Sequence, residues 1–131
     1  MGFIDWDESF STGISLIDDQ HKRLFEIINN YHSGIRNTEV TFQLLLSYVD
    51  FHFNTEERYF EEFKYEDAAK HIMGHIYYEE EIYRLYIEYH SGNYTADRRE
   101  AIEGFIKGWI TRHVKVSDKE YVQCFREHGL Q

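Results

Sequence analysis

The sequence contains no proline, so it lacks the residue that most strongly interrupts helices. Its single cysteine, Cys124, excludes an intramolecular disulfide and suits a reducing compartment. No apolar run reaches the length of a membrane span, and the first residues have neither the basic nor the apolar region of a signal peptide. We therefore expect a soluble, cytoplasmic protein with no segment inserted in a membrane.

Basic residues are also few compared with acidic ones. The chain has 14 Lys and Arg against 24 Asp and Glu, which gives a formal net charge of −10. This charge disfavours binding to nucleic acid and to anionic membrane surfaces. A chain of 131 residues is long enough to bury a sizeable core, and we predict a single domain over residues 1–131.

Apolar residues recur at helical spacing through most of the chain. After an irregular segment, residues 1–17, four long stretches show this periodicity: 18–36, 40–63, 66–90 and 95–114. Asp18 and Asp19 suit the start of the first helix, as a cap or as first-turn carboxylates. Ser117 and Glu120 predict a capping box at the start of a short fifth helix. The fold class is therefore all-α: an antiparallel up-down four-helix bundle with an irregular N-terminal arm and a short C-terminal helix.

Histidine and carboxylate side chains interrupt the apolar stripes of these helices. His52 and Glu56 are four residues apart, between Val49 and Phe60, so both project from one apolar face. An unpaired buried carboxylate is costly. Taken alone, the two residues are best interpreted as a hydrogen-bonded pair in the core.

His71 and His75 are also four residues apart, a spacing that can chelate a metal ion. The alternative is two exposed histidines on a polar helix. No glutamate follows His71 directly, so the motif is not that of the zinc proteases.

His113 and Asp118 are five residues apart, and on a continuous helix they would be rotated by about 140°. The predicted capping box implies instead that the chain breaks near Val116, which lets Asp118 turn back toward His113. The alternative role for Asp118 is to complement a helix N-terminus. His21 lies in the inward stripe of the first helix, where a lone histidine is more often a core residue than a ligand.

The joint pattern is more specific than any one pair. Each of the four long helices directs imidazole toward one centre, and two carboxylates join them. Seven buried titratable groups cannot all be stabilised by mutual hydrogen bonds, whereas metal ions bind the deprotonated forms. The predicted metal ligands are His21, His52, Glu56, His71, His75, His113 and Asp118. The remaining histidines, His32, His90 and His128, are assigned to structural or surface roles.

These donors are nitrogen and oxygen without thiolate, which disfavours iron–sulfur clusters and structural zinc. Five imidazoles exceed what a single ion with an open position needs. We therefore predict two ions bridged by Glu56 and Asp118, one six-coordinate and the other five-coordinate. The vacant position would take a small molecule. Apolar residues beside the ligands are expected to line its pocket, although ordinary core packing explains them equally: Leu24, Phe53, Trp109, Ile110 and Val114.

The motifs match a known family over nearly the whole chain, because the sequence resembles the hemerythrins, especially the bacterial single-domain kind. The matching stretches are 6–7 (WD), 17–25 (IDDQHKRLF), 52–58 (HFNTEER), 71–75 (HxxxH), 109–113 (WITRH) and 117–119 (SDK). The chain departs from the family at residues 64–67, where proline is frequent, and at Tyr78, where phenylalanine is frequent.

The resemblance implies two iron ions per chain with a bridging oxo or hydroxo group. His71, His75 and His113 would hold the six-coordinate iron. His21 and His52 would hold the five-coordinate iron, where dioxygen binds reversibly.

Four functions compete: an oxygen carrier, store or delivery protein; a di-iron oxidase or an enzyme processing peroxide or nitric oxide; an oxygen or redox sensor; and a zinc or iron buffer. Oxidase bundles are rich in carboxylates, whereas this site is rich in histidine, so we predict oxygen binding and no enzyme activity. Sensors of this type usually carry an output domain, for which 131 residues leave no room. We expect a monomer, with an oxygen-consuming protein as a conceivable partner.

Overall fold

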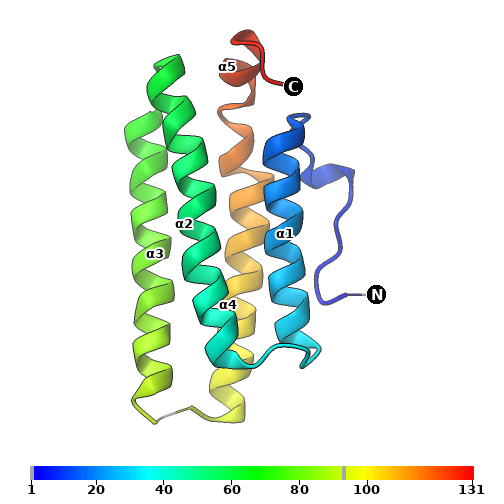
Figure 1. Ribbon diagram of the computed structural model, residues 1–131, viewed down its shortest axis with the longest axis vertical. Helices are drawn as coiled ribbons and strands as arrows, with labels where there is room; N and C mark the ends of the chain where they lie inside the picture. Colours follow the sequence, from blue (N-terminus) through cyan, green and yellow to red (C-terminus); the bar gives the residue numbers. More distant parts are fainter. Residues whose placement is uncertain (1, 93) are drawn as a thin grey trace.

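The computed structural model describes residues 2–92 and 94–131. Four long helices run alternately up and down (Figure 1): α1 (Ser15–His32), α2 (Thr38–Phe63), α3 (Ala68–His90) and α4 (Ala96–Lys115). In contacts along the bundle, α1 packs against α2 and α4, and α2 packs against α3. Three short elements complete the described residues: η1 (Glu8–Phe10), η2 (Ser117–Lys119) and α5 (Val122–Glu127). The predicted all-α bundle is confirmed.

Local signals explain most of the helix ends. The side chain of Asn37 accepts a hydrogen bond from the backbone N–H of Val40, 2.9 Å away, and so caps α2. Thr95 caps α4 in the same way through the N–H of Arg98. The predicted first helix, residues 18–36, is wrong at both ends. The helix begins three residues earlier, and it ends before Gly34, whose φ of 84° is a left-handed conformation that favours glycine.

The predicted capping box at Ser117 is also wrong, although the chain does break at Val116. Ser117 is the first residue of a short 3₁₀ helix rather than the residue before it. Backbone hydrogen bonds hold this turn, from the N–H of Lys119 to the carbonyl of Val116 and from the N–H of Glu120 to the carbonyl of Ser117, each 3.2 Å. The helix breaks at this turn, and the side chain of Asp118 is fully buried inside the bundle.

The N-terminal arm lies along the outside of α1 (Figure 1). Asp18 anchors it, because its carboxylate accepts hydrogen bonds from the hydroxyl of Ser11 and from the N–H and hydroxyl of Thr12, each 2.8 Å. Asp18 therefore sits within the first turn of α1 and acts on the arm, whereas the cap position belongs to Ile14.

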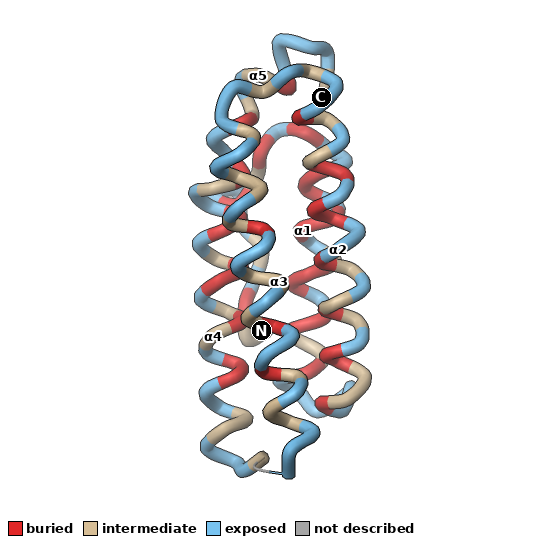
Figure 2. The backbone as a smooth tube through the Cα atoms, turned by 90° about the vertical axis from the view of Figure 1, so that its left-hand side faces the viewer, coloured by how far each residue is buried: buried red, intermediate tan, exposed pale blue. Residues whose placement is uncertain are grey.

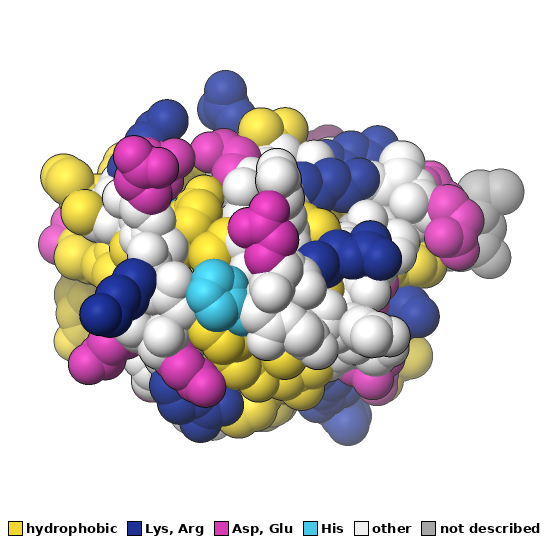
Figure 3. All heavy atoms as spheres, turned by 90° about the horizontal axis from the view of Figure 1, so that it is seen from above, with side chains coloured by type: hydrophobic (Ala, Val, Ile, Leu, Met, Phe, Trp, Pro, Cys, Tyr) yellow, Lys and Arg dark blue, Asp and Glu magenta, His cyan; other side chains and the backbone are white. Residues whose placement is uncertain are grey.

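Buried residues face the interior of the bundle along most of its length (Figure 2). They form two apolar clusters, one along most of the bundle and one at the end covered by α5. Along α1, Ile17 belongs to the end cluster and Leu24 to the long cluster, with His21 between them. Viewed from the α5 end, acidic and basic side chains surround hydrophobic surface (Figure 3). Among the described residues, no helix is long and apolar enough to cross a membrane.

Candidate metal centre

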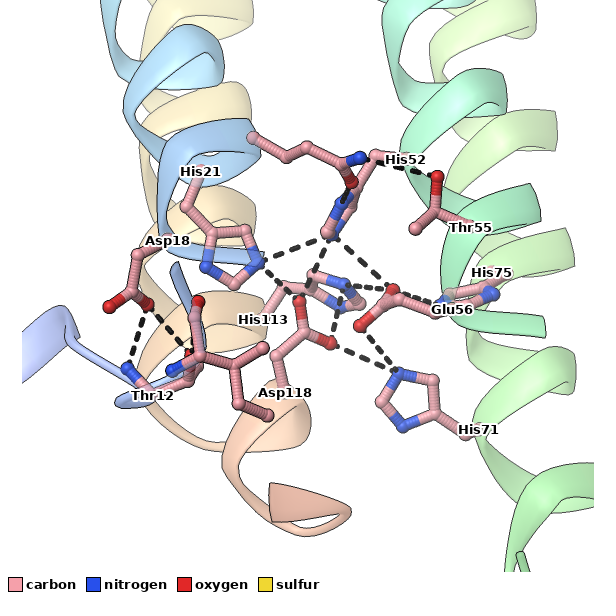
Figure 4. A network of polar contacts seen from close by, with 12 residues as sticks. Thr12, Asp18, His21, His52, Thr55, Glu56, His71, His75, His113 and Asp118 are labelled. Atoms are coloured by element: carbon pink, nitrogen blue, oxygen red, sulfur yellow. Dashed lines mark hydrogen bonds and ion pairs between the residues drawn. The ribbon is translucent and has the colours of Figure 1, made fainter. Parts of the chain in front are cut away.

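All seven predicted ligands lie together inside the bundle (Figure 4). Each long helix supplies at least one of them, and η2 supplies the last. The set is His21 on α1, His52 and Glu56 on α2, His71 and His75 on α3, His113 on α4, and Asp118 on η2. The helical spacings of the sequence therefore do bring these side chains to one place.

The donor atoms form two groups that share one residue. The larger group contains Glu56, His71, His75, His113 and Asp118, and the smaller contains His21, His52 and Asp118. Within each group the donor atoms lie within 4.8 Å of one another. The larger group thus has three imidazoles, and the smaller has two.

The two oxygens of Asp118 face different groups. Oδ2 is 2.6 Å from Nε2 of His21 and 3.2 Å from Nε2 of His52. Oδ1 is 3.0 Å from Nε2 of His71 and 2.9 Å from Nε2 of His113. A carboxylate in this position can join two metal ions.

Glu56 also reaches both groups. Its Oε1 atom is 3.1 Å from Nε2 of His75 and 3.3 Å from Nε2 of His52. Despite these short distances, neither oxygen of Glu56 has a hydrogen-bond partner among the described residues, and the same holds for Nε2 of His75 and of His113. These buried atoms are therefore directed at shared space rather than at each other.

Buried polar atoms without partners are costly, and a bound cation would satisfy all of these. The ionisation of the cluster agrees with this requirement. Burial and the charge of Asp118 oppose ionisation of Glu56, yet the imidazoles of His52, His113 and His75 outweigh them and lower its pKa to about 2. Burial disfavours the charged form of His113, but Asp118 and Glu56 raise its pKa to about 10. In the metal-free protein a proton thus supplies positive charge that a metal ion would supply. The residues present fit a metal centre.

Polar residues around the cluster orient two of the imidazoles. Nδ1 of His52 lies 2.7 Å from Oε1 of Gln20, and the Gln20 amide in turn donates to the hydroxyl of Thr55. Nδ1 of His75 lies 2.7 Å from Oε2 of Glu57. An acceptor at Nδ1 holds the proton there and leaves the Nε2 lone pair directed inward. Sequence reasoning assigned no role to Gln20, Thr55 or Glu57. All three stand in the family-matching stretches 17–25 and 52–58, and each is a polar residue next to a predicted ligand.

The five residues predicted to line a small-molecule pocket are all buried in the long apolar cluster. Phe53 stacks on His75, with ring centroids 3.7 Å apart and an interplanar angle of 7°. The Trp109 ring lies 5.7 Å from that of His113. Tyr78 is close to both, 4.8 Å from Trp109 and 6.1 Å from His113. These positions suit an apolar wall beside the ligands, and the pocket itself stays a prediction.

The other three histidines lie outside the cluster. His32 pairs with Glu103 at 3.0 Å, and His90 pairs with Glu39 at 3.0 Å. His128 stacks on Phe63.

A sequence model of one protein family, described as the hemerythrin HHE cation binding domain, matches residues 12–125. The chain belongs to the hemerythrin family. The resemblance that the motifs predicted is therefore confirmed, and the cation-binding description agrees with the cluster of donors inside the bundle.

Individual relatives span nearly the whole chain. A bacteriohemerythrin of Methylococcus capsulatus is 29% identical over 130 residues, which cover 95% of this chain and 98% of the relative. A bacteriohemerythrin of Pseudomonas aeruginosa is 27% identical over 131 residues, covering 96% of this chain and 84% of the relative. A hemerythrin-like protein of Naegleria gruberi is 31% identical over 117 residues, covering 89% of each chain.

Solved hemerythrin structures have the same fold. The crystal structure of a wild-type hemerythrin superimposes with a TM-score of 0.80 at 25% identity, covering 93% of this chain and 97% of that one. Family and fold together suggest a di-iron, oxygen-binding type of protein.

Proposed function

We propose that this hemerythrin binds dioxygen reversibly at a non-haem di-iron centre and acts as an oxygen carrier, store or delivery protein rather than as an enzyme. The observation that carries the proposal is the unequal division of imidazoles on either side of a shared carboxylate. Three imidazoles lie in the group with Glu56 and Asp118, and two lie on the other side of Asp118.

This division supports one saturated and one open ion. His71, His75 and His113, two carboxylate oxygens and a bridging oxo or hydroxo group would fill six positions. His21 and His52, with two carboxylate oxygens and the same bridge, would fill five. Nitrogen and oxygen donors of this kind suit iron. When bound, the two ferrous ions would supply the electrons on which reversible dioxygen binding depends.

The side chains of the chain have distinct tasks in this proposal. The Glu56 and Asp118 carboxylates offset the positive charge of the ions and link the three-imidazole group to the two-imidazole group. Gln20 and Glu57 keep the imidazoles of His52 and His75 in one orientation. Leu24, Phe53, Trp109, Ile110 and Val114 exclude water from the open side, which slows oxidative loss of the bound gas and favours its release unchanged.

The ratio of imidazole to carboxylate favours a carrier over an oxidase. Oxidase bundles of the ferritin type use four glutamates with two histidines. Here five histidines surround two carboxylates. A neutral donor adds no negative charge to an ion, so a histidine-rich site stabilises high oxidation states less than a carboxylate-rich one. This contrast supports reversible binding and the absence of enzyme turnover.

The test is repeated oxygenation of the reduced protein. Metal-free protein is loaded anaerobically with two equivalents of ferrous iron and cycled between oxygen and argon, while its charge-transfer absorption is followed. We expect the absorption to appear and disappear over several cycles with little loss. Irreversible bleaching with consumption of oxygen or peroxide would favour an enzyme. The monomeric state, the cytoplasmic location and the single-domain organisation stay predictions.

A further inference from the structure

A small cavity leads from the surface to the cluster of donors. It has a volume of about 70 Å³, and it lies between α3 and the turn that follows α4. His71 and His113 form part of its wall. By contrast, the larger cavity between Tyr77 and Gly108 is lined by none of the seven ligands.

The two ligands that line this cavity are more exposed than the ligands that do not. The side chain of His71 is 6% exposed and that of His113 is 3% exposed, whereas Glu56 and Asp118 are at 0%. His21 and His52 are also fully buried. Solvent therefore reaches the cluster at His71, on the side of the three-imidazole group.

Two carboxylates stand at the outer end of the cavity. Asp67 precedes α3, Glu120 follows η2, and both are exposed residues that line the opening. Both act on the same hydroxyl. Burial is the largest cause that raises the pKa of Tyr65 to about 12, and the charges of Asp67 and Glu120 are the next. Lys70 also lines the opening, so the formal charge of Asp67, Glu120 and Lys70 together is −1.

The inner end of the cavity presents two imidazoles of the cluster, those of His71 and His113. Nε2 of His113 is buried and makes no well-directed hydrogen bond among the described residues, although Oδ1 of Asp118 lies 2.9 Å away. The cavity thus joins carboxylates that can attract a cation to an imidazole that can bind one when it gives up its proton.

We propose that this cavity is the portal through which ferrous ions enter the metal-free protein. Asp67 and Glu120 capture the hydrated cation, and His71 is the first imidazole to replace its water. His113 and Asp118 then draw the ion inward. The proposal rests on the metal centre proposed above, and it adds the route and the residues of loading.

Gly74 lines the cavity, one residue before His75 on α3. A Cβ atom built there meets nothing within 4 Å, so a leucine can be introduced without a clash at its first carbon and can extend over the mouth of the cavity. Gly108 on α4 has equally open space and lines the other cavity, which makes it a matched control.

Trp109 provides a readout of loading that does not depend on oxygen. Its ring lies 5.7 Å from the His113 ring, so a ferrous or cobaltous ion bound by His113 is expected to quench its fluorescence. Trp6 is the only other tryptophan in the sequence, and Trp6→Phe removes its background signal. Anaerobic stopped-flow mixing of the metal-free protein with Fe²⁺ or Co²⁺ then gives the rate of entry.

We expect Gly74→Leu to slow loading at least tenfold and Gly108→Leu to leave it unchanged. The Asp67→Asn, Glu120→Gln double variant is expected to slow loading several-fold and to weaken its dependence on salt. Extraction of metal by a chelator should slow by the same factor in Gly74→Leu, because blocking a path changes both directions and leaves the equilibrium alone.

The number of metal ions bound per chain at equilibrium distinguishes a failure of the portal from a failure of the metal centre proposed above. Two ions per chain in every variant, with loading at the wild-type rate in Gly74→Leu and in the double variant, would overturn the portal and leave the metal centre intact. Failure of the unmodified protein to bind two ions would overturn the metal centre itself. If Gly74→Leu fails to fold, the exposed double variant alone decides: wild-type loading overturns the portal, and slowed loading with full metal content supports it.

Discussion

Gln20 and His52 are joined by a buried hydrogen bond, with 2.7 Å between Oε1 of the amide and Nδ1 of the imidazole. The amide cannot rotate freely, because its nitrogen donates to Thr55 at 3.2 Å. The hydroxyl of Thr55 is itself held, since it donates to the carbonyl of Phe51 at 3.0 Å. This chain of contacts ties the orientation of one proposed iron ligand to the backbone of α2.

Removing this support is expected to weaken metal binding without removing a ligand. We predict that Gln20→Ala lowers the affinity for the second metal ion by about 10- to 100-fold. Competition with a chelator of known affinity measures the change. The control is Gln43→Ala, which removes an exposed glutamine that donates to Glu39 in its own helix. Equal affinities in the two variants would show that the Gln20 contact does not orient the ligand.

Asp118 is predicted to be the residue on which occupancy by two ions depends most. Its two oxygens face opposite groups of imidazoles, so Asp118→Ala removes a donor from both. We expect metal content to fall from two ions per chain to one or fewer, as measured by elemental analysis after gel filtration. Asp97→Ala, an exposed change in the first turn of α4, should retain both ions. Retention of two tightly bound ions by Asp118→Ala would contradict a bridging role.

The stability of the metal-free protein should fall as the pH rises above neutrality. The pKa of His113 is raised from 6.5 to about 10, so the folded state holds a proton that the unfolded state has released. The stability from this group is fully present below pH 6.5 and is lost as the pH rises toward 10. Urea unfolding between pH 6.5 and 9.5 measures this loss, with an expected slope of about one proton.

Variants identify the source of that slope. His113→Asn should remove it, whereas His32→Asn, which changes a partly exposed histidine paired with Glu103, should not. A metal-free protein equally stable at pH 6.5 and 9.5 would contradict the protonated state of His113.

Glu56 gives the opposite dependence at acid pH. Its pKa is lowered from 4.5 to about 2, so its contribution to the stability of the folded state is present above pH 4.5 and is lost as the pH falls toward 2.

The apolar wall can be tested with two leucines of the same cluster. Leu24 lies three residues after His21, whereas Leu45 lies seven residues before His52, about 10 Å along the helix axis. Both are buried, so each change to alanine should lower the free energy of unfolding by about 2–5 kcal/mol. Only Leu24→Ala is expected to speed autoxidation, by several-fold or more, because it admits water beside the open position. Equal autoxidation rates in the two variants would remove Leu24 from the pocket.

The sequence was enough to predict the fold class and the convergence of seven side chains. Helical spacing decides which residues share a face, and His52 with Glu56, like His71 with His75, follows that rule directly. Asp118 needed a chain break that the sequence also predicted, although a backbone turn produces it and Ser117 does not cap it.

Features that depend on neighbouring helices could not be predicted in the same way. Gln20 points across to α2, and Glu57 points across to α3, but periodicity within one helix carries no information about what faces it. The ends of α1 depend on the packing of the arm through Asp18 and on the left-handed Gly34. The portal depends on the distance between α3 and the η2 turn, which is set by tertiary packing.

The central claim is that each chain holds two iron ions that share Glu56 and Asp118. Elemental analysis of the purified, fully loaded protein, read together with its absorption spectrum, tests this claim most directly. The account predicts two irons per chain and an oxo-bridge charge-transfer band, both lost when His21 and His71 are replaced by alanine. A saturated protein that holds only one ion per chain, or two ions that survive those replacements, would contradict it.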